Sequence, residues 1–353
     1  MTAPITDITR HLTALVAVDS QNPPRAITTD GPLVAACRAG LPGFDINVVD
    51  YGQGSIVIDA KRGAPRVLFN VHMDTVPVAE GWSRNPHDLL VTEDRAIGLG
   101  SCDIKGAAAV LFALAASTDA PMHLVLSTDE EAGQSTCIRR YLENPPDVDL
   151  AVVAEPTSVK PILQHRGISS NRLTFVGSSA HSSETGVKSA IHDAARWTVA
   201  VLDHPEATPN RLNVGRVEGG VKPNMIAASA EVLFGFRHAP GTDHNELLAA
   251  FDHLLPEGAE RHPRFLGPAL PSDSDGKSAT AQTGAAKIIQ EFGFELGEPV
   301  DFWTEASLFS AAGVPATVMG PGHIAQAHTA DEWVPLADLA AAFTAYERIV
   351  THG

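Results

Sequence analysis

The chain has 353 residues, of which 44% are hydrophobic and 19% are charged, a composition that excludes disordered and collagen-like proteins. Acidic residues outnumber basic ones by 42 to 25, and the resulting formal charge of −17 would repel a phosphate backbone, so nucleic acid is not an expected partner. The longest uncharged apolar run, residues 106–118, is shorter than the ~20 residues that span a bilayer, and residues 1–10 contain no apolar segment of a secretory signal. Neither a membrane partner nor export is therefore expected.

The cysteine pattern adds an expectation about the compartment. Cys37, Cys102 and Cys137 form no CxxC pair, and three cysteines cannot all be paired within one chain. We therefore predict a soluble protein of a reducing compartment, most simply the cytoplasm.

The first half of the chain alternates between strand-like and helix-like segments. Short apolar runs at 66–71, 123–127 and 151–154 predict strands that are buried on both faces. Between the first two, the Ala- and Leu-rich stretch 105–117 predicts a crossover helix. This alternation predicts an α/β domain with a mostly parallel or mixed sheet and helices on both faces.

The pattern changes after about residue 166. Predicted elements follow in the order strand, helix, strand, strand and helix, at 171–176, 187–202, 211–217, 227–237 and 243–255. With one more strand this is the βαββαβ order of a small two-layer α+β domain.

The end of the chain returns to α/β character. Residues 267–276 are rich in Pro, Gly, Ser and Asp and predict a linker, after which 316–319 predicts a strand and 336–350 a helix. We therefore predict a discontinuous catalytic domain at 1–166 and 271–353, with a second domain at 167–270 inserted into it.

Five short segments that carry chemistry follow predicted strands or lie in the turns after them. The first, NVHMDTVP at 70–77, contains His72 and Asp74. If the strand continues to Asp74, both side chains point to the same face, so that the carboxylate can orient an imidazole that binds metal. Alone, this triplet is weak evidence, because a turn aspartate beside an incidental histidine is the commoner case.

The other four segments each have an ordinary structural explanation as well. Asp103 in GLGSCDIKG precedes a predicted helix and could simply cap it. The adjacent carboxylates of STDEEAG at 127–133 could form a solvated acidic turn, although a dication also relieves their repulsion. The segments AEPT and AHTADE add Glu155 at a strand end and His328 after a Gly-Pro-Gly turn.

Taken together, the segments supply two histidines and at least three carboxylates at strand ends, where open α/β sheets bind ligands. Imidazole and carboxylate ligands suit zinc, cobalt or manganese. The chain contains no GxSxG, GxxxxGK[ST], HExxH or complete GxGxxG motif, which disfavours serine hydrolases, P-loop enzymes and dinucleotide dehydrogenases.

HMDTVP, GLGSCDIKG, STDEEAG, AEPT and AHTADE, in this order and spacing, resemble the M20 family of dinuclear zinc aminoacylases and peptidases. GSCDIKG and FWTEASLF make the chain most similar to the branch of acetylornithine deacetylase and succinyl-diaminopimelate desuccinylase. The resemblance implies a zinc-peptidase-like mixed-sheet catalytic domain, with the inserted domain serving as a lid and a dimerisation domain. It also implies a cis peptide bond after Asp103.

The resemblance assigns roles to eight residues of the site. Two divalent ions, zinc by expectation with cobalt or manganese as alternatives, would be held by His72, Asp103, Glu131, Glu155 and His328. Asp103 would bridge the ions, with His72 and Glu155 completing one site and His328 and Glu131 the other. Glu130 would be the general base, Asp74 would support the His72 site, and His181 would stabilise the carbonyl oxyanion, in dimers often from the partner subunit.

Four further residues are expected to contact the substrate. Asn224 and Arg237 match substrate-binding segments of the inserted domain, and the Arg237 guanidinium could hold an α-carboxylate through two parallel hydrogen bonds. Glu305 and Gly322 could line the pocket. The alternatives are a salt bridge within the inserted domain for Arg237 and a surface-loop position for His181, and Cys102 is expected to pack rather than to react.

The sequence thus predicts a zinc-dependent amidohydrolase that removes the acetyl group from N-acetylornithine in arginine biosynthesis, with Glu130 as general base. N-acetylcitrulline is the next candidate substrate, followed by succinyl-diaminopimelate and dipeptides. A non-catalytic binding homologue is the least favoured alternative. The expected partners are a small N-acyl amino acid and a second copy of the chain.

Overall fold

The chain forms two compact units in a computed structural model that describes residues 3–24, 27–131, 135–272 and 276–352. The first unit comprises 1–163, 276–299 and 304–353, and the second comprises 164–275 and 300–303. The predicted inserted domain was 167–270, so the second unit extends further at both ends and includes a short returning segment. Residues 273–275 of the predicted linker and Ala132 and Gly133 of STDEEAG lie outside the described residues.

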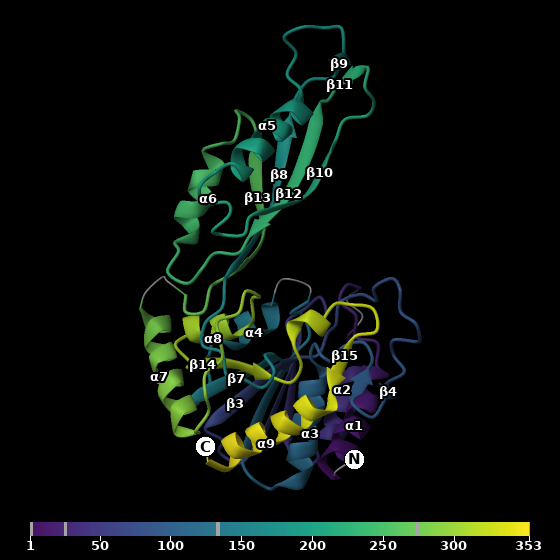
Figure 1. Cartoon of the computed structure of the whole chain (residues 1–353), viewed down its shortest axis with the longest axis vertical. Helices are drawn as coiled ribbons and strands as arrows, with labels where there is room; N and C mark the ends of the chain where they lie inside the picture. The colour runs from purple at the N-terminus through teal and green to yellow at the C-terminus, as the bar shows by residue number, and fades with distance from the viewer. Residues whose placement is uncertain (1–2, 25–26, 132–134, 273–275, 353) are drawn as a thin grey trace. The chain divides into compact units, whose positions relative to one another are not determined.

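The first unit is built on a six-stranded mixed sheet of order β1-β2-β6-β3-β7-β14 (Figure 1). Its strands are β1 (Asp45–Asp50), β2 (Ile56–Arg62), β3 (Val67–His72), β6 (Met122–Ser127), β7 (Leu150–Pro156) and β14 (Ala316–Gly320). The pairs β6/β3, β3/β7 and β7/β14 are parallel, whereas β1/β2 and β2/β6 are antiparallel. The four parallel strands therefore end at one edge of the sheet, which is where ligands bind in folds of this class.

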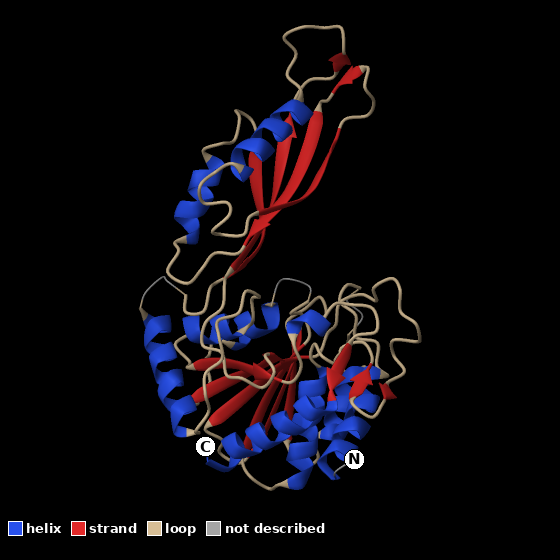
Figure 2. Ribbon diagram, in the orientation of Figure 1, coloured by secondary structure: helices blue, strands red, loops and turns tan. Residues whose placement is uncertain are grey.

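Helices cover the faces of this sheet (Figure 2). In chain order they are α1 (Ala3–Val16), α2 (Pro32–Gly40), α3 (Lys105–Ser117), α4 (Thr136–Tyr141), α7 (Lys277–Glu291), α8 (Ala306–Ala311) and α9 (Leu336–His352). Helix α3 packs against α1, α9 and β3, while α8 packs against β7 and β14. The predicted α/β architecture with a mixed sheet is confirmed.

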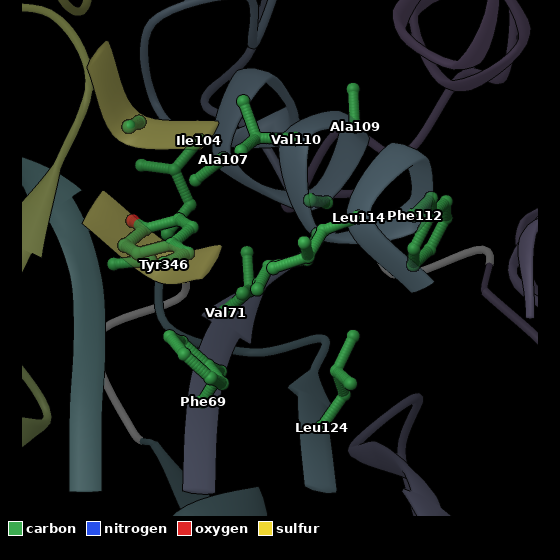
Figure 3. Close-up of a cluster of buried hydrophobic side chains, with 14 of the residues drawn as sticks. Phe69, Val71, Ile104, Ala107, Ala109, Val110, Phe112, Leu114, Leu124 and Tyr346 are labelled. Carbon is green, nitrogen blue, oxygen red and sulfur yellow. The ribbon is translucent and has the colours of Figure 1, made fainter. Parts of the chain in front are cut away.

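The core of the first unit is centred on α3, whose residues 105–115 are all buried. Figure 3 shows Ala107, Val110 and Leu114 of this helix facing the strand residues Phe69 and Val71. Tyr346 of α9 closes the cluster, with its ring 5.1 Å from that of Phe69 and its hydroxyl donating to the Met319 carbonyl. This packing fixes the start of α3, which immediately follows Asp103.

A small sheet lies beside the main one. It has the order β15-β5-β4, formed by β15 (Trp333–Pro335), β5 (Arg95–Ile97) and β4 (Leu90–Val91). The 3-10 helix η1 (Ile324–Gln326) precedes it. The pairing of Trp333 with Ile97 brings the AHTADE segment against the GLGSCDIKG segment.

The second unit has the predicted two-layer order with two extra short strands. Its elements are β8 (Ile168–Val176), β9 (Ala180–His181), α5 (Ala190–Leu202), β10 (Asn213–Gly219), β11 (Met225–Ile226), β12 (Ser229–Phe236), α6 (His244–Asp252) and β13 (Glu260–Gly267). The antiparallel sheet has the order β10-β12-β8-β13, and α5 and α6 pack on one face of it (Figure 2). Trp197 of α5 and Phe251 of α6 meet Phe234 and Phe236 of β12 in its core.

The structure also differs from the sequence predictions in detail. Strand β3 ends at His72 and does not continue to Asp74, although the Met73 N–H still donates to the Ser127 carbonyl of β6. Helix α5 begins three residues later than predicted. None of the described helices is long and apolar enough to cross a membrane.

Candidate metal centre

Three of the predicted metal ligands lie where parallel strands end. His72 is the last residue of β3, Glu155 lies near the end of β7, and Glu131 follows β6 by four residues. Within the sheet, His72 is paired in register with Ser127 of β6. The parallel sheet thus places these side chains at one edge, as its topology requires.

Asp103 lies between the two histidines. Its Oδ1 is 2.9 Å from Nε2 of His72, and its Oδ2 is 3.2 Å from Nε2 of His328. The two carboxylate oxygens thus face different imidazoles. This is the geometry required of a carboxylate that bridges two cations.

Two glutamates complete the cluster, one on each side of Asp103. Glu131 Oε1 lies 3.1 Å from His328 Nε2, and Glu155 Oε1 lies 3.7 Å from His72 Nε2. His72, Asp103 and Glu131 each offer one ligand atom, and these atoms all lie within 4.8 Å of one another. These three side chains are thus close enough to belong to one metal centre.

The negative charges of these buried carboxylates are not fully balanced by the positive charges of the protein around them. Burial first, and then the charges of Asp103 and Glu131 against the opposing effect of His72, raise the pKa of Glu155 to about 8. Hydrogen bonds to Asp103 and Glu131 raise the pKa of His328 to about 11. Glu155 thus favours its protonated form, whereas hydrogen bonds to the two histidines hold the pKa of Asp103 below its usual value. Crowded carboxylates of this kind are commonly compensated by a bound cation.

A family model described as Peptidase family M20/M25/M40 matches residues 68–352. The chain belongs to this family. It is 45% identical to the N-acetyl-L-citrulline deacetylase of Xanthomonas campestris pv. campestris over 99% of both chains. The family predicted from the five motifs is confirmed, and the chain is a hydrolase of the M20 group.

Solved structures show the same fold at low sequence identity. Aminopeptidase PepT from Bacillus cereus superposes with a TM-score of 0.74 and 16% identity, covering 98% of each chain. YXEP protein of Bacillus subtilis, described as a dinuclear metal binding peptidase of the M20 family, superposes with a TM-score of 0.62 and 15% identity, covering 98% of each chain. At this identity the likeness concerns the fold alone.

Asp74, which we predicted to support the His72 site, lies beyond the end of β3 and beside His72. Its Oδ1 is 3.5 Å from His72 Nδ1, which also lies 3.0 Å from the Asp74 carbonyl. Its two oxygens accept the backbone N–H groups of Glu130 and Glu131, and the Asn22 amide donates to Oδ2. Asp74 therefore ties the orientation of His72 to the segment that carries both glutamates.

Glu130 lies in the same turn as Glu131 but outside the close cluster of ligand atoms. Its pKa is raised well above the usual value, by burial first and then by the charges of Glu131, Glu155 and Glu305 against the opposing effect of His72. A carboxyl with a raised pKa is suited to accept a proton near neutral pH.

Sequence analysis did not identify the role of Glu332. This buried carboxylate accepts three backbone N–H groups, from Gly100 at 2.8 Å, Cys102 at 2.8 Å and Asp103 at 3.0 Å. It therefore fixes the turn that presents Asp103, whose peptide bond to Ile104 is cis, as the resemblance implied. Its place in AHTADE was visible, but acceptance of backbone N–H groups leaves no pattern in the sequence.

Asp129 was also missed as an individual residue. It is fully buried, accepts the Ser55 hydroxyl at 2.8 Å, and accepts the Cys137 N–H at 3.2 Å. It anchors the start of the Glu130–Glu131 turn. The first carboxylate of STDEEAG is thus structural, whereas the next two face the centre.

The remaining predicted residues of the first unit lie close to the M20 centre. Gly322 has a φ of +83°, and an added Cβ would lie 2.6 Å from Cys102 Sγ. Cys102 is buried with its thiol pKa raised, chiefly by burial, so that it packs as predicted. Glu305 is buried beside β6 and accepts the Ser127 hydroxyl at 3.0 Å.

The three predicted residues of the second unit lie in two places. His181 pairs with Met225 across β9 and β11, and the Ser182 N–H donates to the Asn224 carbonyl, so His181 and Asn224 are neighbours. Arg237 follows the far end of β12, where it lines a cavity of about 310 Å³ with Arg211 and Arg264. The unit thus separates Arg237 from the other two by the length of a strand.

Proposed function

We propose that the protein hydrolyses the amide bond of N-acetylcitrulline, releasing acetate and citrulline. The observation that carries this proposal is the 45% identity, over 99% of both chains, to a protein named for that reaction. Our sequence prediction favoured N-acetylornithine, and the motifs GSCDIKG and FWTEASLF keep it as the second candidate. The two substrates share the acetyl amide and the α-carboxylate and differ only at the distal group.

We propose two divalent cations at the centre, with Asp103 between them. His72 and Glu155 would hold one ion, and His328 and Glu131 the other, in keeping with the pairing of distances around the two Asp103 oxygens. When bound, such ions lower the pKa of water and polarise a carbonyl. Zinc is the expected metal, and the same ligands accept cobalt or manganese.

Side chains of the protein itself would transfer the protons of the reaction and orient the metal ligands. Glu130, with its raised pKa, would accept the proton of the attacking water on a carboxylate oxygen and return it to the leaving amine. Asp74 would keep Nδ1 of His72 engaged, so that Nε2 stays directed at Asp103.

The second unit would contribute substrate contacts and the dimer interface. We propose that His181 and Asn224, which lie together, bind the acyl carbonyl and nearby polar groups of the substrate held by a second copy of the chain, because a whole strand separates them from Arg237 of their own chain. Arg237, in a cavity with two further arginines, would hold the α-carboxylate. The exposed strand β10 is proposed as the surface that pairs with a second copy.

The test is the specificity constant of the metal-reconstituted enzyme. We expect kcat/KM for N-acetylcitrulline to exceed that for N-acetylornithine, succinyl-diaminopimelate and a dipeptide. A higher value for N-acetylornithine would replace the first candidate by the second. Metal analysis separates both from a non-catalytic homologue, since about zero bound metal after reconstitution would refute the hydrolase proposal.

A further inference from the structure

Glu305 is a buried carboxylate that is only half satisfied. It is 1% exposed, its Oε2 accepts the Ser127 hydroxyl at 3.0 Å, and its Oε1 has no hydrogen-bond partner among the described residues. A buried acceptor without a donor is costly in a folded protein, so Oε1 can take a donor that the described residues do not supply.

The Glu305 side chain does not cap the helix that follows it. It precedes α8 in the capping position, yet its side chain makes no cap hydrogen bond there. The Thr304 hydroxyl instead accepts the Ala306 N–H at that helix start.

The sheet register places Glu305 beside the metal centre. Its partner Ser127 is paired with His72 in the parallel β3/β6 ladder, and adjacent strands lie about 4.8 Å apart. Side chains of paired residues point to the same face, so the Ser127 hydroxyl brings Glu305 to the flank of His72.

From this geometry we infer that Glu305 determines substrate specificity by accepting an N–H of the distal group of the substrate. This inference rests on the proposed function and names the chemistry that the site selects: an N-acetyl amino acid whose side chain ends in a nitrogen donor. The ammonium of ornithine and the ureido group of citrulline both supply such donors, whereas an alkyl side chain supplies none.

The experiment compares three substrates that share the acetyl amide and α-carboxylate: N-acetylornithine, N-acetylcitrulline and N-acetylnorvaline. Wild-type enzyme should prefer a substrate with a distal donor to N-acetylnorvaline by at least about tenfold in kcat/KM, as a hydrogen bond to a charged group allows. In Glu305→Leu, kcat/KM for the preferred substrate should fall by about 10- to 100-fold, and that for N-acetylnorvaline by less than about threefold. Glu305→Gln keeps an acceptor oxygen without the charge, so N-acetylcitrulline should lose less than N-acetylornithine.

Matched controls separate this role from a structural one. Ser307→Ala changes a buried α8 residue whose hydroxyl donates to the Thr304 carbonyl, and it should alter none of the three values. Metal content and thermal unfolding show whether each variant is folded and loaded.

Two outcomes would overturn the inference: an equal loss on all three substrates in the Glu305 variants, or a wild-type enzyme that does not distinguish N-acetylnorvaline. The second outcome is measured on wild-type enzyme, so it does not depend on whether a variant folds. Failure of the proposed function looks different, because wild-type enzyme would then hydrolyse none of the three.

Discussion

Glu130 and Glu131 are neighbours in sequence with different geometry, and this contrast supports a direct test. Glu131 lies 3.1 Å from His328 and belongs to the group of ligand atoms, whereas Glu130 does not. Glu130→Gln should lower kcat by about 10²- to 10⁴-fold, the range for loss of a general base, while metal per chain stays unchanged. Metal analysis and steady-state kinetics on the same preparation check this.

The matched control is Glu143→Gln, which changes an exposed glutamate paired with Arg140 at 2.6 Å. It should retain full activity and metal. Loss of metal in Glu130→Gln would instead make Glu130 a ligand and remove it from the role of base.

At the residue scale, sequence analysis found the groups with distinctive chemistry and missed those that act through the backbone. His72 and Asp103 are 31 positions apart, and only the joint motif pattern linked them before the structure placed Oδ1 2.9 Å from Nε2. Glu332 accepts three N–H groups, which any residue could donate, so no spacing of side chains could have indicated it.

At the scale of elements, strand pairing and hydrogen bonds join the segment after β14 to the turn before α3. β15 pairs with β5, and Glu332, directly before β15, accepts the N–H groups of the turn that ends in Asp103. His328 precedes Glu332 by four residues. The Glu332 carboxylate therefore helps to set the distance between Asp103 and His328.

Glu332→Gln should loosen this connection. The amide offers one acceptor oxygen, and its NH₂ would face a backbone N–H, so the Asp103 turn loses part of its anchoring. We expect metal affinity to weaken by about 10- to 100-fold, the usual cost of removing a group that orients a ligand. Titration calorimetry with zinc measures it without reference to activity.

Asp331→Asn provides the comparison, because Asp331 bonds Ser83 and not the Asp103 turn. It should leave the zinc affinity within about threefold of wild type. Equal weakening in both variants would mean that the segment is merely sensitive to charge.

Elements were predictable where burial was uniform. Strands β3, β6 and β7 are buried along their whole length, and α3 has the predicted bounds, because apolar runs and helix formers signal such elements. Strand β1 alternates between exposed and partly exposed residues and carries Asp at both ends, so its sequence resembles a loop. Tertiary pairing with β2, rather than local preference, makes it a strand.

At the scale of the whole molecule, the metal centre couples stability to pH. In the folded chain the pKa is raised to about 8 for Glu155, chiefly by burial, and to about 11 for His328 by its carboxylate partners. Between pH 6.5 and 8 the folded state then holds more protons than the unfolded state, so stability falls as pH rises.

Metal removal should expose this dependence. The Tm of chelator-treated protein is expected to fall from pH 6.5 to pH 8, because bound cations no longer replace those protons. Zinc-reconstituted protein should have a higher Tm and a smaller decline over the same range. Differential scanning calorimetry at fixed ionic strength tests both, and parallel declines would show that the centre does not control the pH dependence.

The second unit carries the features of an assembly surface. Strand β10 is an edge of its sheet with β12 as its neighbour, and Val217 on it is 50% exposed. Val199 and Leu202 of the adjacent helix α5 are also largely exposed. Edge strands with exposed apolar side chains readily pair with another chain, and a symmetric dimer would join two copies of β10.

Val217→Lys should therefore shift the protein from dimer to monomer in sedimentation equilibrium, since two lysines would meet at the symmetric interface. If a partner supplies His181 to the centre, activity should fall in parallel with the dimer fraction. Leu296→Lys alters a similarly exposed apolar residue of the first unit, 54% exposed, and should change neither quantity. A Val217→Lys protein that remains dimeric would place the interface elsewhere, and a fully active monomer would show that one chain completes the site.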